Sequence, residues 1–171
     1  MEEELEDLYT VCLKNVKVIL PITMIGKNLR ENIYKKLNNT YGGKCIAEGY
    51  VKSESINIIE ISSGRITKGT EIEFDVVISF KVCYPVKDMI ITCRSISVTK
   101  AGIRAELANE RPSPLIVYIA RDHYGGASQD DGSGPSPADI DSKNQIFKAK
   151  IIGTRFELND KQISVISELY S

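Results

Sequence analysis

The most regular pattern of hydrophobic and polar positions along the chain lies between residues 71 and 84. Every even position from Ile72 to Tyr84 is apolar or aromatic, and most odd positions are charged or polar. Alternate side chains of a β-strand point to opposite faces, so the pattern predicts one long strand with a single buried face. Pro85 follows directly, and its missing backbone donor indicates a break or a change of sheet.

A second strand-like run covers residues 89–98. The turn signal Thr99-Lys100-Ala101-Gly102 separates it from an alternating run at 103–107. The long strand is therefore expected to run out of one packed unit, residues 1–85, and into a second, residues 86–171.

The first unit has the pattern of an α+β domain. An alternating strand at residues 9–20 is predicted, with a slip near Asn15 and an end at Pro21. Apolar residues then recur every four positions from Ile25 to Leu37, which predicts an amphipathic helix with Thr23 as its candidate N-cap. Three further segments are expected: a strand pair at 44–51 and 55–61, joined around Lys52-Ser53-Glu54, and a loop at 62–69. One helix on an antiparallel sheet is the expected architecture.

The second unit contains five short strand patterns and one long insertion. Beyond the opening hairpin, the strands are expected at 115–120, 145–157 and 162–169. Five such strands fit an all-β barrel of the S1/OB type, with a sandwich fragment as the alternative. The insertion at 125–142 holds four glycines, two prolines, four serines, four aspartates and no basic residue, which predicts a flexible loop.

Composition narrows the function classes. The net charge of −1 gives no general preference for nucleic acid. The four cysteines form no Cys-x-x-Cys motif and His123 is the single histidine, so no metal or cofactor is predicted and the thiols are expected to be buried in a reducing compartment. The acidic start is unlike a signal peptide, and no apolar run approaches the ~20 residues of a membrane span. We therefore expect an intracellular protein with no membrane segment.

Catalytic motifs are absent from the sequence. There is no phosphate-cradling Gly-x-x-x-x-Gly-Lys loop and no Gly-x-Ser-x-Gly elbow. Asp122 and His123 are adjacent, and on a strand adjacent side chains point to opposite faces, so a dyad is not expected. The chain is predicted not to be an enzyme.

Charge within the second unit points to nucleic acid. Residues 86–171 hold eleven basic and eleven acidic residues, and four of the acidic ones lie in the 125–142 segment. Outside that segment eleven bases face seven acids, with aromatic residues among them, and single-stranded nucleic acid is bound by basic grooves and stacking aromatics. The alternative is that Phe147 and Phe156 are core residues and the lysines are solvated. The candidate RNA-binding residues are Lys100, Arg104, Arg121, His123, Tyr124, Lys148 and Arg155, with the cations on phosphates and His123 and Tyr124 stacking on bases.

An ordered set of motifs resembles a known family. The run Lys150-Ile151-Ile152-Gly153-Thr154-Arg155, followed by Asn159-Asp160 and a final Ile-Ser strand, resembles the end of the larger stalk subunit of multisubunit DNA-directed RNA polymerases. This family has archaeal members and eukaryotic equivalents. The run from Lys100 to Glu106 is similar to the family's S1-type hairpin, and residues 22–37 and the strand before Pro85 fit its helix and interdomain strand.

The resemblance implies a non-catalytic stalk subunit with a ribonucleoprotein-like tip domain and a barrel that faces nascent single-stranded RNA. It also implies a heterodimer with a smaller helical stalk subunit, and a tip that docks on the polymerase core near the clamp through Ser63, Gly64, Arg65 and Ile66. The richness in Ile, Lys and Asn suits a divergent version from a large DNA virus, located at a cytoplasmic replication site or in the virion; a cellular eukaryotic version would be nuclear. The alternative function is a free-standing S1/OB single-stranded RNA-binding module or translation factor.

Overall fold

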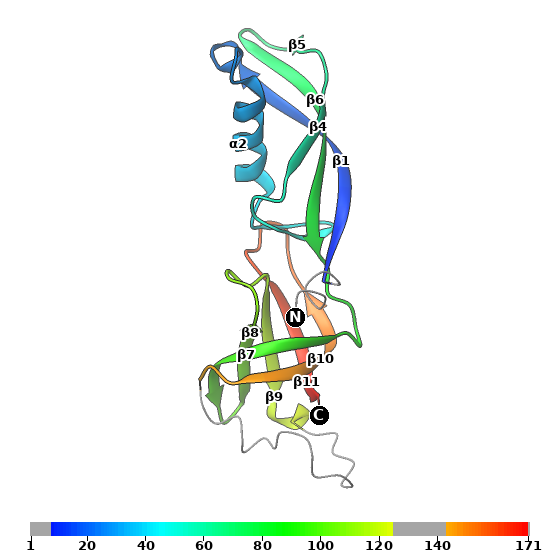
Figure 1. Cartoon of the computed structure of the whole chain (residues 1–171), viewed down its shortest axis with the longest axis vertical. Helices are drawn as coiled ribbons and strands as arrows, with labels where there is room; N and C mark the ends of the chain where they lie inside the picture. Colours follow the sequence, from blue (N-terminus) through cyan, green and yellow to red (C-terminus); the bar gives the residue numbers. More distant parts are fainter. Residues whose placement is uncertain (1–7, 125–142, 171) are drawn as a thin grey trace.

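The computed structural model describes residues 8–124 and 143–170, and the segment predicted as a flexible loop, 125–142, lies outside these residues. The molecule is elongated, with a sheet carrying one helix at one end and a barrel at the other (Figure 1). The long strand β6, Glu71–Cys83, runs along the first part and ends beside the barrel.

The N-terminal sheet is built on both edges of β6. Along one edge, β1 (Tyr9–Pro21) pairs antiparallel over its full length, from Tyr9 opposite Cys83 to Pro21 opposite Glu71. Along the other edge lie three short strands in succession: β3 (Gly49–Val51), β4 (Asn57–Ile61) and β5 (Arg65–Ile66). The two-residue strand β2 (Cys45–Ile46) pairs with β3 and ends the sheet.

Several expectations for this sheet are corrected. The pairing of β1 with β6 is continuous, so the slip near Asn15 is wrong; Val11 and Leu13 point away from the core and are 64% and 70% exposed. Residues 44–51 form the β2–β3 hairpin, and β3 and β4 each pair with β6 instead of with one another. The predicted loop at 62–69 contains the short strand β5.

One helix covers the inner face of the sheet. After the 3-10 turn η1 (Ile22–Met24), α2 spans Leu29–Tyr41 and buries Ile33 and Leu37 against the sheet. The helix begins later than its apolar spacing predicts, because the chain first forms η1. Its N-cap is therefore Asn28, which makes no side-chain capping bond, and Thr23 is not the cap.

The second part is a closed five-stranded barrel. Its strands are β7 (Ile90–Thr99), β8 (Gly102–Leu107), β9 (Leu115–Ala120), β10 (Ile146–Arg155) and β11 (Ile163–Tyr170). The order around the barrel is β7-β8-β9-β11-β10, with β9 and β11 parallel and the other neighbours antiparallel. A closed barrel replaces the sandwich alternative and is compatible with the OB fold.

Two local features shape the barrel. A Cβ at Gly102 would lie 2.3 Å from the carbonyl oxygen of Ile119, so the close approach of β8 to β9 requires a glycine there. β9 has the predicted bounds, and the chain then turns into η2 (Arg121–His123), a 3-10 helix, so Asp122 and His123 do not lie on a strand as the argument against a dyad assumes.

The two parts meet in a shared packed region. Cys83, Tyr50 and Cys45 from the sheet belong to the same buried cluster as the barrel core. The amide of Cys45 donates to the carbonyl of Asp160 at 2.7 Å, and the amide of Asn159 donates to the carbonyl of Cys45 at 2.9 Å. These bonds tie the sheet to the turn between β10 and β11.

A polar cluster closes the same junction. The Tyr9 hydroxyl donates to Glu110 Oε2 at 2.8 Å, and Lys52 Nζ lies 3.2 Å from Glu110 Oε1 and 4.7 Å from the centre of the Tyr9 ring. Burial and the neighbouring carboxylate raise the pKa of the Tyr9 hydroxyl, so it remains a donor.

The cysteines are free thiols. Cys45, Cys83 and Cys93 are buried, whereas Cys12 is only partly covered. Burial raises the pKa of Cys45 to about 11 and that of Cys93 to about 12, so these thiols remain protonated at neutral pH.

Candidate functional site

An open groove of about 390 Å³ lies on the outside of the barrel over β8 and β9. Arg104 on β8 stands opposite Tyr118 on β9, and both side chains are exposed. Directly opposed residues on antiparallel strands place their Cβ atoms about 4.5–5.5 Å apart. The guanidinium and the phenol ring therefore share one surface, and Ser97 and Thr99 of β7 line its rim.

Two further predicted cations lie at one end of this groove. Lys100 is in the exposed turn between β7 and β8. The amide of Arg121 donates to the carbonyl of Ala101 in the same turn, at 3.2 Å, which brings η2 next to it. Arg104 and Tyr118 line the groove, and Lys100 and Arg121 lie beside its lining residues Ala101 and Ala120, at one end of the same surface.

The other two predicted cations lie elsewhere. Lys148 and Arg155 are on β10, which β7 separates from β8 and β11 separates from β9. Arg155 pairs in register with Ser164, at the end of the barrel opposite η2, and its guanidinium lies 3.7 Å from Glu157. These two residues do not join the groove on β8 and β9.

The two predicted stacking residues lie in and after η2. His123 is partly covered, and the ring of Tyr124 packs against the barrel core. The Tyr124 hydroxyl is buried without a partner among the described residues, and burial raises its pKa. Tyr124 therefore offers less ring surface than Tyr118, which is 44% exposed.

Sequence reasoning missed Tyr118 as a site residue because it lies within the continuous apolar run 115–120. Two signals point to it: it is the only aromatic residue in that run, and it lies close to Arg121 in the sequence. Its neighbour on β11 is Ile166, which is also exposed. Tyr118 and Ile166 together form an exposed apolar surface across β9 and β11.

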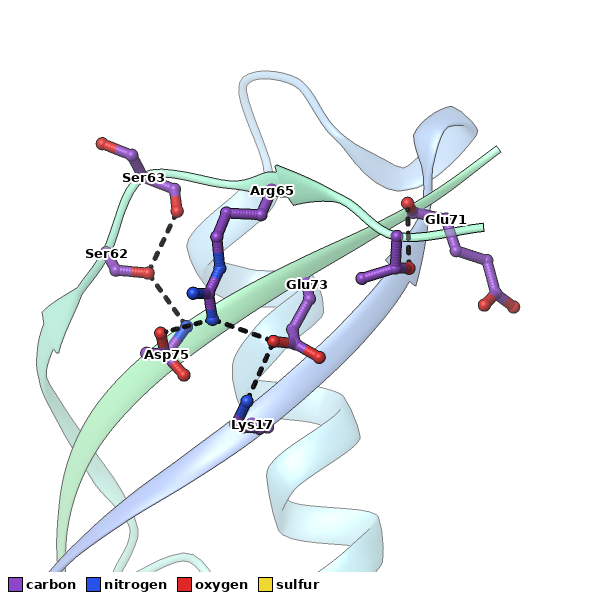
Figure 2. A network of polar contacts seen from close by, with 8 residues as sticks. Lys17, Ser62, Ser63, Arg65, Glu71, Glu73 and Asp75 are labelled. Atoms are coloured by element: carbon purple, nitrogen blue, oxygen red, sulfur yellow. Dashed lines mark hydrogen bonds and ion pairs between the residues drawn. The ribbon is translucent and has the colours of Figure 1, made fainter. Parts of the chain in front are cut away.

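A second candidate region lies at the far end of the N-terminal sheet, around β5. Figure 2 shows Arg65 between two carboxylates of β6, with its Nη2 2.9 Å from Glu73 Oε1 and 2.9 Å from Asp75 Oδ2. Lys17 Nζ lies 3.1 Å from the same Glu73 oxygen. The bond from Lys17, with Arg65 nearby, lowers the pKa of Glu73 below its usual range. Arg65 is thus already engaged within its own sheet.

The other predicted docking residues differ in exposure and role. A Cβ at Gly64 would lie 2.6 Å from an Ile72 methyl group and 2.9 Å from the Phe74 ring, so this glycine lets the chain pass close to its own core. Ser63 is exposed, and its carbonyl accepts a bond from the Ser62 hydroxyl (Figure 2). Ile66 is 77% exposed and is the one residue of the four with an apolar side chain.

Neither region resembles a metal centre. Among residues 8–124 and 143–170, no three His, Cys, Asp or Glu side chains are grouped to hold a metal ion. In the same residues no helix is long and apolar enough to cross a membrane. No known family model matches the sequence, and no curated protein matches it.

Proposed function

We propose that this chain is a non-catalytic subunit of a DNA-directed RNA polymerase, of the stalk type, and that its barrel holds single-stranded RNA in the groove over β8 and β9. The observation that carries the RNA role is the exposed pair of Arg104 and Tyr118 on adjacent strands, with Lys100 and Arg121 beside it. β8 and β9 are the second and third strands of the barrel, and OB-type barrels bind oligonucleotides on that face.

The chemistry of the groove suits single-stranded RNA without strong sequence preference. A phenol ring stacks on any base, because every base has a π-face, and the guanidinium and ammonium groups attract phosphates. Three cations around one exposed ring make a small contact area, so weak binding with modest salt dependence is expected.

The stalk assignment rests on the resemblance together with the order of the two parts. A sheet with one helix precedes a barrel, and β6 leads from one to the other, as that resemblance implies. The proposed partners are the smaller helical stalk subunit, the polymerase core near the clamp, reached through Ser63 to Ile66, and nascent RNA. Because Arg65 is paired with Glu73 and Asp75, Ile66 is the residue we expect to contribute most to core binding.

Fluorescence anisotropy with labelled single-stranded RNA at two salt concentrations tests the RNA role. Tyr118→Ala should cost about 1–3 kcal/mol of binding free energy, and Arg104→Ala should flatten the slope of log K against log salt by about 0.7. Arg155→Ala is the matched control, since it removes an exposed arginine from the far end of the barrel. Equal losses for Arg104→Ala and Arg155→Ala would contradict the groove.

Co-purification separates the stalk subunit from the alternative of a free-standing RNA-binding module. Tagged protein recovered from its own source should bring down a small helical partner and the large polymerase chains. Recovery alone, or as a homo-oligomer, would favour the free-standing module while leaving the RNA groove intact.

A further inference from the structure

A second groove, of about 470 Å³, lies between the helix and the sheet of the N-terminal part. One wall is Lys27, just before α2, together with Arg30 and Tyr34 on the helix. The other wall is Ile56, just before β4, together with Asn57 and Ile58 on the strand. This groove is independent of the barrel and of the RNA role.

The β4 wall of the groove is a sheet edge. Within the described residues β4 pairs only with β6, so its second edge has no strand partner. The carbonyl of Ile58 on this edge accepts a hydrogen bond from Arg30 of α2. An edge of this kind is a template for an added strand, and such added strands bind through main-chain hydrogen bonds.

The charged residues on the helix side of the groove indicate the charge of its ligand. Lys27 and Arg30 are exposed cations, and among the described residues Glu31 is the one acidic residue that lines the groove. Glu31 Oε1 is already 2.7 Å from Lys35 Nζ, so its charge is compensated by its own helix. The residues that line the groove therefore carry a net positive charge, and Glu60 of β4 is not among them, which favours a ligand with carboxylates beside Lys27 and Arg30.

We propose that this groove receives an extended acidic peptide segment of a partner protein, which pairs with the free edge of β4 and places carboxylates beside Lys27 and Arg30. Arg30 then exchanges its bond to the Ile58 carbonyl for a carboxylate, and a peptide N–H takes over that carbonyl. The five residues of β4 span about 17 Å at 3.3–3.4 Å per residue, so about five peptide residues are held.

The test uses the full chain and a labelled peptide of about nine residues that alternates valine and glutamate, a length that overlaps β4 at both ends. Two matched peptides accompany it: one with lysine in place of glutamate, and one with alternate backbone nitrogens methylated, which keeps the charge and removes main-chain donors. Anisotropy gives the affinities, and amide hydrogen exchange gives the contact site.

The acidic peptide should bind, and both matched peptides should bind at least about tenfold more weakly. Exchange of amides in residues 56–61 should slow on binding. Arg30→Glu should weaken the acidic peptide at least about tenfold, whereas Lys36→Glu, which changes a cation on the β1 side of α2, should change it less than about twofold.

Three results would overturn the proposal. Equal binding of the methylated peptide would mean charge attraction without strand pairing. Equal effects of Arg30→Glu and Lys36→Glu would mean a diffuse helix charge with no groove. No binding at about 1 mM peptide would mean that Arg30 only protects the edge of β4.

Discussion

Replacing Gly102 with alanine should destabilise the barrel, because no space exists for a side chain between β8 and β9. The added Cβ would lie 2.3 Å from the Ile119 carbonyl oxygen and 3.2 Å from Ala120 Cα, whereas ordinary contact begins at 3.4 Å. The overlap of about 1 Å involves backbone atoms, which cannot rotate away as a side chain can. The strands must therefore separate at the rung that joins Gly102 to Ala120.

The magnitude follows from two effects. Overpacking in a well-packed site costs about 1–3 kcal/mol. Loosening the neighbouring ladder hydrogen bond adds about 1 kcal/mol. Gly102→Ala is therefore expected to lower the free energy of unfolding by about 2–4 kcal/mol.

Urea unfolding followed by circular dichroism measures this change through the midpoint, provided that the slope stays constant. Gly153→Ala is the matched control, since Gly153 lies at the β10 bulge and no atom of the residues that the structure describes stands within 4 Å of a Cβ there. Its free energy of unfolding should stay within about 0.5 kcal/mol of wild type, as for substitutions away from packed features. Equal midpoints for the two variants would refute the close approach of β8 to β9.

Three further predictions concern the N-terminal sheet and the junction. Phe80→Asp should unfold the chain at room temperature or cost several kcal/mol, because Phe80 is buried in the same core cluster as Ile33 and Leu37 of α2 and the charge would have no partner. A near-wild-type melting temperature would contradict this. Tyr9→Phe should cost about 1–3 kcal/mol in urea unfolding, because it removes the bond to the Glu110 carboxylate, and a smaller loss would show that water replaces it. The folded protein lowers the pKa of Glu73, so the stabilising effect of this carboxylate is present above its ordinary pKa of 4.5 and is lost as pH falls through the lower folded pKa. The difference in free energy of unfolding between wild type and Glu73→Gln should therefore disappear in acid. A difference independent of pH would contradict the Lys17 bond.

The elements that depend on a local period are predictable from the sequence. The alternation from Ile72 to Tyr84 predicts β6, and each of the five strands of the barrel is visible as a short pattern. On β1 the alternation predicts the wrong buried face for the first half of the strand, because Val11 and Leu13 are apolar but lie on the exposed outer face. A slip near Asn15 is then needed to reconcile two faces that both look hydrophobic.

Pairing between distant segments is harder to predict. β3, β4 and β5 align one after another along β6, and only the register with β6 shows this. The same limit applies to the candidate site: three of the seven predicted residues gather near Tyr118, because β8, β9 and η2 are neighbours in the barrel. Lys148 and Arg155 have the same residue chemistry, but the barrel order places them on another side.

Cross-linking of RNA to the full chain tests whether single-stranded RNA lies in the groove over β8 and β9. Single-stranded RNA carrying 4-thiouridine is irradiated with the protein, and the linked peptides are identified by mass spectrometry. We expect links at Tyr118 or elsewhere in β8 and β9, and their loss in Tyr118→Ala. Links confined to β10 or α2, with none on β8 or β9, would contradict it.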